Sequence, residues 1–196
     1  MITLGIEFEL KYSATAEALD AISAALSGDW CQITMETTYY DTPEHALSQR
    51  HYTLRRRLEN GKSICTVKIP LEDTSRGEWE TECPSVTEAI PVLCKLGAPK
   101  DLLPLTQAGV VTVCGARFIR RACTIPFADA TLEVALDQGV LFSGAREIPL
   151  CELEVELKSG PREGAVLFAH RLAKTYQLQP QPRSKFRRAL DLREEV

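Results

Sequence analysis

The opening stretch of the chain, GIEFELKYS, places charged residues at alternate positions. Glu7, Glu9 and Lys11 alternate with apolar residues, so an extended backbone would send the charges to one face and the apolar side chains to the other. Carboxylates bind hard divalent cations, and a lysine binds phosphate oxygens. Metal and phosphate chemistry could therefore take place on this face, although a strand that simply turns its charges to water shows the same alternation.

Charged residues of the same parity recur in later strand-like stretches. Arg55 and Arg57 form a basic pair, and Glu152, Glu154 and Glu156 form an acidic series. Like charges on neighbouring strands destabilise an exposed sheet, so a solvated face rarely carries such clusters. An acidic and a basic block on one face are what a site for a divalent metal and a polyanion requires. The expected charged face contains Glu7, Glu9, Lys11, Arg55, Arg57, Lys68, Arg76, Glu78, Glu80, Glu133, Asp137, Glu152, Glu154 and Glu156.

Strands are the main elements that must position these residues. The stretch LRRRLENGKSICTVKIP has two strand-like halves around Asn60 and Gly61, the strongest short signal for a hairpin. Residues 117–127 and 131–139 predict a further strand pair, and residues 151–160 predict another strand. A sheet that curled its charged face inward would remove its own edges and would gather these charges around one lumen.

Three amphipathic helices are expected to cover the apolar face, over residues 15–28, 85–97 and 161–178. Ser13 or Thr15 is the expected cap of the first helix, and Ser85 with Glu88 has the spacing of a capping box in the second. Pro91 should weaken or kink the second helix. With no linker or internal repeat, the pattern predicts one α+β domain over residues 1–196.

Composition narrows the possible partners and locations. A net charge of −4 over 196 residues argues against a general nucleic-acid surface, which needs a dense basic face. We expect a cytosolic protein without membrane association, because no leader-like stretch or long apolar segment is present. The seven cysteines form no C-x-x-C pair and leave one over, so reduced thiols are expected.

The motifs and their order resemble the CYTH superfamily, also called triphosphate tunnel metalloenzymes. The opening EFELK matches the family's E-x-E-x-K signature, and the resemblance continues along essentially the whole chain. The further matching stretches are YYDTP, LRRR, VKIP, RGEWE, LEVALDQG, CELEVEL and SKFRRAL. The resemblance implies a closed antiparallel β-barrel of about eight strands that forms a charged tunnel, covered outside by amphipathic helices.

The resemblance also assigns roles to residues. It implies that Glu7, Glu9, Lys11 and Glu154 are catalytic. The implied substrate-binding residues are Lys11, Arg55, Arg57, Lys68, Arg76, Arg120 and Lys185. The implied metal ligands are Glu7, Glu9, Glu78, Glu80, Glu133, Asp137, Glu152, Glu154 and Glu156. Two positions stay open, because a bulge would turn Arg121 inward in place of Arg120, and Arg76 could instead be a surface residue of a hairpin.

The implied activity is hydrolysis of a triphosphate that depends on Mg²⁺ or Mn²⁺, with inorganic triphosphate as the first choice of substrate and pyrophosphate and phosphate as products. The matching residues all suit phosphate, and none evidently reads a base or a thiazolium ring. A class IV adenylyl cyclase, a thiamine triphosphatase and a non-catalytic polyphosphate-binding module stay open as alternatives. The expected partner is a small-molecule triphosphate or polyphosphate, and the sequence leaves a homodimer open.

Overall fold

A computed structural model describes residues 5–71 and 76–193, with side chains from Phe8 onward in the first range. In chain order the elements are β1 (Gly5–Glu7), β2 (Glu9–Ser13), α1 (Ala16–Ala25), β3 (Cys31–Asp41), the short 3₁₀ helix η1 (Ser48–Arg50), β4 (Thr53–Glu59), β5 (Lys62–Pro70), β6 (Arg76–Glu82), α2 (Val86–Lys95), α3 (Leu102–Leu105), β7 (Val111–Phe127), β8 (Ala130–Ser143), β9 (Arg146–Ser159), α4 (Arg162–Tyr176), β10 (Gln179–Pro180) and α5 (Lys185–Asp191).

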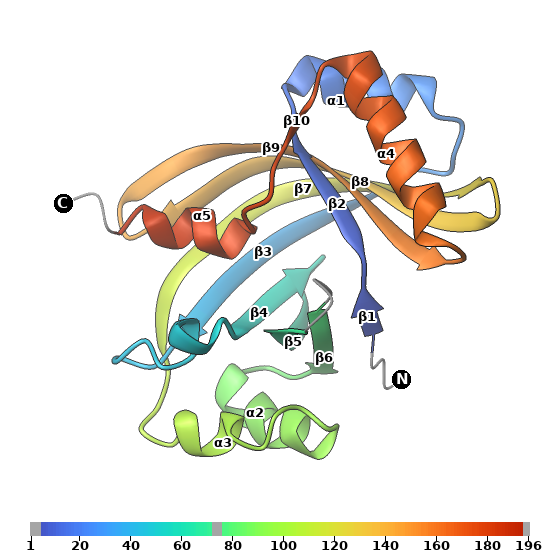
Figure 1. Cartoon of the computed structure of the whole chain (residues 1–196). Helices are drawn as coiled ribbons and strands as arrows, with labels where there is room; N and C mark the ends of the chain where they lie inside the picture. The colour runs from blue at the N-terminus through green and yellow to red at the C-terminus, as the bar shows by residue number, and fades with distance from the viewer. Residues whose placement is uncertain (1–4, 72–75, 194–196) are drawn as a thin grey trace.

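The strands form one antiparallel sheet in the order β1-β6-β5-β4-β3-β7-β8-β9-β2-β10. β1 and β2 follow each other in the chain and are separated at Phe8, yet β1 pairs with β6 and β2 pairs with β9 (Figure 1). The α+β class and the large antiparallel sheet are confirmed. The closed barrel is not confirmed, because hydrogen bonds do not close the described sheet, which has ten strands instead of about eight.

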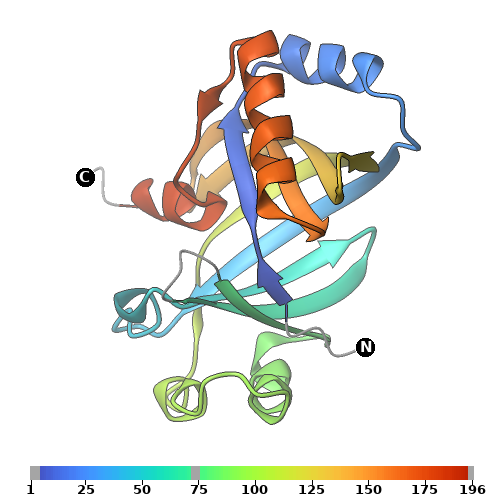
Figure 2. The ribbon, with the colours of Figure 1, turned by 45° about the vertical axis from the view of Figure 1, so that its right-hand side comes forward.

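α1 and α4 cover one outer face of the sheet, as Figures 1 and 2 show. Leu19 and Ile22 of α1 and Phe168 of α4 pack with Leu132 and Val155 from the strands beneath. These strand residues alternate with the charged positions of β8 and β9, so the same alternation that turns the charges inward supplies this core.

α2 and α3 pack against the far side of β4, β5 and β6 at the lower end of Figure 1. Glu88 donates its backbone N–H to the Ser85 hydroxyl, which donates to the Glu88 carboxylate, so Ser85 is confirmed as the cap of α2 and Glu88 contacts its side chain. Thr15 caps α1. Pro91 lies in the second turn of α2, where it removes the N–H that would otherwise bond to the Thr87 carbonyl. The helix nevertheless continues to Lys95.

α5 is a helix that the sequence did not predict, and it packs on the inner face of β3, β7 and β8 (Figure 1). Phe186 and Leu190 meet Met35, Phe118 and other apolar residues there. The inner face of the sheet is therefore apolar beneath α5 and charged farther along.

Other structural expectations can be checked directly. The β4–β5 hairpin turns at Asn60 and Gly61, both with positive φ, and all seven cysteines are free thiols. No helix in the described ranges is long and apolar enough to cross a membrane.

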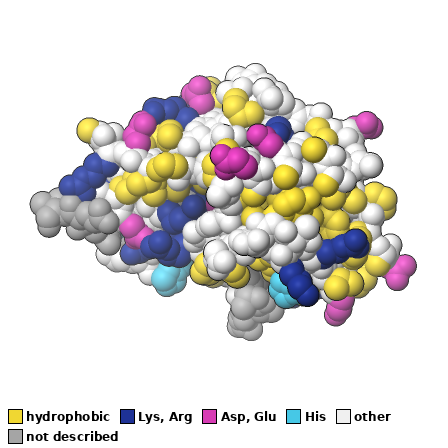
Figure 3. Space-filling model, turned by 90° about the horizontal axis from the view of Figure 1, so that it is seen from above, with side chains coloured by type: hydrophobic (Ala, Val, Ile, Leu, Met, Phe, Trp, Pro, Cys, Tyr) yellow, Lys and Arg dark blue, Asp and Glu magenta, His cyan; other side chains and the backbone are white. Residues whose placement is uncertain are grey.

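The face seen from above in Figure 3 carries acidic and basic side chains interspersed with apolar ones.

Candidate functional site

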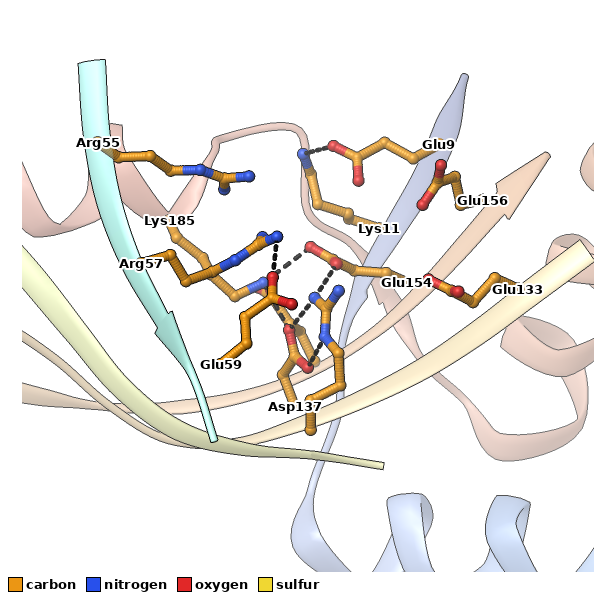
Figure 4. A network of polar contacts seen from close by, with 12 residues as sticks. Glu9, Lys11, Arg55, Arg57, Glu59, Glu133, Asp137, Glu154, Glu156 and Lys185 are labelled. Atoms are coloured by element: carbon orange, nitrogen blue, oxygen red, sulfur yellow. Dashed lines mark hydrogen bonds and ion pairs between the residues drawn. The ribbon is translucent and has the colours of Figure 1, made fainter. Parts of the chain in front are cut away.

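The charged inner side chains surround a cavity of about 440 Å³. Strands from both halves of the sheet and the start of α5 contribute to its wall (Figure 4). Its basic lining residues are Lys11, Arg55, Arg57, Lys68, Arg76, Arg120, Lys158 and Lys185. Its acidic lining residues are Glu9, Glu78, Glu80, Glu133, Glu154 and Glu156. The two blocks of charge that the parity argument put on one face therefore meet in one cavity.

One wall of the cavity is mainly basic and comes from β4, β5 and β6. Lys68 and Glu78 are directly paired across β5 and β6, and Lys68 Nζ lies 3.4 Å from Glu78 Oε1. An Arg55 nitrogen lies at the same distance from that oxygen. Burial would raise the pKa of Glu78, but Lys68 and Arg55 outweigh it and hold this pKa below its ordinary value. Glu78 is therefore a charged acceptor between two cations.

The opposite wall carries a row of three carboxylates on neighbouring strands. Glu156 of β9 is paired in register with Glu9 of β2 on one side and with Glu133 of β8 on the other. Like charges placed opposite each other destabilise a sheet unless cations neutralise them. Lys11 Nζ lies 2.7 Å from Glu9, and Lys158 Nζ lies 2.9 Å from Glu156 and 3.5 Å from Glu133.

A buried ionic network lies beneath this row. Asp137, Glu152 and Glu154 have carboxylate oxygens within 4.8 Å of one another. Arg120 donates through Nε and one terminal nitrogen to both oxygens of Asp137, each at 2.7 Å. Lys185 Nζ lies 2.8 Å from Asp137 and from Glu154 and also contacts Glu152. The three carboxylates could hold a cation, and basic side chains of the protein already surround them.

The field of this network fixes the charges of Arg120, Lys185 and Glu154, whereas burial raises the pKa of Glu152. Burial would lower the pKa of Arg120 and Lys185, but their carboxylate neighbours outweigh it and raise both values. Burial would raise the pKa of Glu154, but Lys185 and Arg120 hold it well below its ordinary value. Glu152 also accepts from Arg188 of α5, so α5 is bound to the sheet by two charged side chains.

The structure brings most of the predicted site residues to the cavity. Asp137 and Glu152 are the described exceptions: both are fully buried and do not line it. The Glu7 side chain lies outside the described part of the chain. The alternative at positions 120 and 121 is resolved, because Arg120 lines the cavity and Arg121 instead pairs with Asp20 of α1 at 2.8 Å. Arg76, the first residue of β6, is half-buried and lines the cavity.

Sequence reasoning missed several inner residues. Lys158 continues the parity of the acidic series on β9, and Glu59 continues that of Arg55 and Arg57 on β4, so the same alternation could have included both. Tyr39 and Phe186, like Lys158, line the cavity. Nothing in their own stretches signals this, because it depends on how β3 and α5 pack, with ring centroids 5.1 Å apart.

Comparison with known proteins gives a consistent result. A model of the CYTH domain family matches residues 5–190. An inorganic triphosphatase of Haemophilus influenzae is 30% identical over 125 residues, which are 63% of this chain and 36% of the relative. A candidate triphosphatase of Bacillus subtilis, YjbK, is 32% identical over 103 residues, 52% of this chain and 54% of that protein. The matches thus span about half or less of these relatives.

Two solved structures share the fold. A candidate adenylyl cyclase from Hippeastrum, with a dominant triphosphatase activity, has a TM-score of 0.63 at 18% identity, covering 100% of this chain and 97% of that one. A protein from Pyrococcus horikoshii has a TM-score of 0.59 at 20% identity, covering 96% and 99%. At this level of identity the likeness establishes the fold alone.

Proposed function

The chain belongs to the CYTH domain family, and we propose on this basis that it hydrolyses inorganic triphosphate to pyrophosphate and phosphate with the aid of Mg²⁺ or Mn²⁺. The names of the two triphosphatase relatives support the reaction class. The observation that carries the proposal is one cavity in which a basic wall faces a row of carboxylates. A site that only bound anions would have no use for that row.

The carboxylate row fits a divalent metal by the chemistry of its donors. Glu9, Glu133 and Glu156 offer oxygen ligands from three adjacent strands, and oxygen is the ligand that Mg²⁺ and Mn²⁺ favour. Glu78 and Glu80 line the same cavity, and Glu7 completes the proposed set. When bound, the metal would neutralise phosphate oxygens and lower the pKa of a bound water.

The basic wall would hold the phosphates and stabilise the leaving group. Arg55 and Arg57 present planar donors suited to phosphate oxygens, and Lys68 and Lys11 add point charges. The oxygen of a water forms a bond to the terminal phosphorus while the bond from that phosphorus to its bridging oxygen breaks. A cavity carboxylate accepts the proton of the water, and pyrophosphate leaves against the basic wall. Positioning and charge neutralisation supply the catalysis.

Arg120 and Lys185 were predicted to bind substrate, and their contacts favour a positioning role. The three donors of an ammonium group match the three carboxylates that Lys185 contacts. Arg120 is similarly engaged with Asp137 and Glu154. We therefore propose that both residues hold Glu154 in position and add positive charge at the bottom of the cavity.

The aromatic lining favours inorganic triphosphate over thiamine triphosphate or ATP. A base or a thiazolium ring would need an accessible aromatic face. Phe118 is buried, and its ring already lies within 5.8 Å of the Arg120 guanidinium carbon and 5.3 Å of Lys185 Nζ. Tyr39 and Phe186 pack against each other. Within the described lining, the aromatic rings therefore serve the protein's own packing.

We also propose that the cavity works as a tunnel. The segment from Gly5 to Ser13 supports this, because its two halves pair with β6 and β9 near opposite ends of the strand order. The chain itself thus bridges the two ends of the sheet at Phe8, whose carbonyl accepts from the Leu157 N–H at 2.9 Å. A lumen bounded in this way would exclude bulk water around the phosphates.

The direct test is phosphate release from inorganic triphosphate, ATP and thiamine triphosphate with Mg²⁺ or Mn²⁺. The wild type should cleave inorganic triphosphate fastest, and Glu9→Gln should lose most of this activity. Glu82→Gln, which alters an exposed residue paired with Lys62, is the matched control and should behave as wild type. Cyclic AMP formation from ATP, or no cleavage of any of the three, would contradict the proposal.

A further inference from the structure

We propose that Glu59 is an internal anion that occupies Arg57 when no polyphosphate is bound and that gives way when a phosphate group takes its place. The inference rests on the proposed function, since it assumes that the cavity binds a polyphosphate. It adds a residue that controls how tightly the phosphates are held.

Glu59 is the last residue of β4 and shares a face with Arg55 and Arg57. Its carboxylate forms an ion pair with the terminal nitrogen of Arg57, as Figure 4 shows. Arg57 lines the cavity, whereas Glu59 is not among the lining residues, and its side chain keeps 30% of its accessible surface. Glu59 therefore approaches Arg57 from the rim and can move toward solvent without disturbing the core.

Arg57 needs a counter-charge in the free protein. Burial and the neighbouring positive charge of Arg55 lower its pKa, which means that the charged guanidinium is destabilised where it lies. Its Nε atom is buried and has no hydrogen-bond partner in the described structure. The guanidinium thus has one nitrogen on Glu59 and an unsatisfied Nε, so its charge is only partly compensated in the free protein.

The Arg57–Glu59 pair differs from other ion pairs of the cavity. Lys11, Lys68 and Lys158 pair with Glu9, Glu78 and Glu133 or Glu156. Those carboxylates belong to the proposed metal-ligand set, so metal binding would loosen their hold on the cations.

Glu59 lies outside the proposed metal-ligand set, and metal binding leaves its pair with Arg57 intact. A phosphate group carries more negative charge and more acceptor oxygens than a carboxylate. The phosphate itself is therefore what displaces Glu59.

The exchange has two opposite consequences for a variant without this carboxylate. Arg57 would lose its counter-charge beside Arg55, so the free protein should become less stable. A polyphosphate would no longer compete with an internal anion, so it should bind more tightly. A residue that only supported the fold would give the first effect alone, and one that held Arg57 in position for the substrate would weaken binding.

The test is calorimetric titration of the full chain with inorganic tripolyphosphate in EDTA, with melting curves of the free and bound protein. Glu59→Gln should bind roughly two- to fivefold more tightly than wild type, the range that a partly exposed ion pair corresponds to. Its free form should melt at a lower temperature and should gain more from the ligand. Glu59→Asp, whose shorter carboxylate reaches Arg57 less well, should give an intermediate affinity, and it tests the inference if the glutamine variant does not fold.

Glu82→Gln is the matched control and should leave affinity unchanged. Unchanged or weaker binding by Glu59→Gln, with wild-type binding intact, would overturn this inference and leave the proposed function standing. No tripolyphosphate binding by either protein in EDTA would overturn this inference, and the phosphate-release assay with Mg²⁺ or Mn²⁺ then tests the proposed function by itself.

Discussion

Lys185 Nζ lies 2.8 Å from Glu154 Oε1, and this ion pair joins α5 to the middle of β9 beneath the cavity. Both side chains are almost fully buried. A buried charge without a partner is costly, so each residue depends on the other. The position of a site carboxylate is thus linked to the docking of a helix from another part of the chain.

Lys185→Met should destabilise the protein by about 3–5 kcal/mol at pH 7, because it leaves three buried carboxylates with less counter-charge. In the wild type the pKa of Glu154 is lowered, so its stabilisation is present above the ordinary carboxyl pKa and is lost as the pH falls through the lowered value. In the variant, protonation of the three buried carboxylates relieves the repulsion among them, so a lower pH offsets part of its loss of stability. Urea unfolding in EDTA at pH 7 and pH 4.5 should show the difference between the two proteins narrowing at the lower pH. A constant difference would contradict this account.

Arg120→Gln and Arg121→Gln form a matched pair of neighbours on opposite faces of β7. Arg120 makes a two-pronged contact with fully buried Asp137, so its loss should cost about 3–5 kcal/mol of unfolding free energy. Arg121 pairs with Asp20, which is 69% exposed, so its loss should cost about 0–1 kcal/mol. Urea denaturation measures both. Equal losses would show that the buried network does not carry the stability assigned to it.

Lys158→Met should strengthen divalent metal binding. Lys158 Nζ lies between Glu133 and Glu156, so the ammonium group and a metal would compete for the same carboxylates. We expect Mn²⁺ to bind roughly two- to fivefold more tightly, as the loss of a partly exposed ion pair would allow. The concentration of free Mn²⁺, followed by electron paramagnetic resonance, reports this without an activity assay. Lys174→Met, at an exposed position of α4, is the control. Unchanged or weaker Mn²⁺ binding by Lys158→Met would contradict a metal on this row of carboxylates.

Thiol reactivity should separate the exposed Cys31 from the three buried cysteines. Burial raises the pKa of Cys65 and Cys123 to about 11 and that of Cys114 to about 12, so few thiolates form at pH 8. Cys31 is exposed. Iodoacetamide under native conditions should modify Cys31 at least about tenfold faster than these three, as peptide mass spectrometry would show. Comparable rates in native protein would indicate that the sheet opens on the labelling timescale.

Alternation and turn chemistry predicted much of the sheet. Glu152, Glu154 and Glu156 share the inner face of β9 as expected, and Asn60-Gly61 makes the expected hairpin. These signals are local, because side-chain parity and positive φ depend on a few neighbouring residues.

The parts that sequence reasoning missed depend on long-range packing. Parity put Asp137 and Glu152 on the charged face but could not reveal that Arg120 and the short α5 would cover them. α5 has seven residues, too few for periodicity to identify a helix. The position of α5 against Phe118 depends on strands from distant parts of the chain packing together.

The division of the first strand at Phe8 has a consequence for how the protein is made. Glu9 and Lys11 are among the first described residues to leave the ribosome, but their partners on β9, Glu156 and Glu154, are synthesised much later. Pairings so distant in the chain form slowly, and an unpaired strand edge is prone to aggregation while it waits. The cavity can be complete only after β9 and α5 have been synthesised. A nascent chain that stops before β9 would therefore hold the amino-terminal half of its site without the strand that faces it.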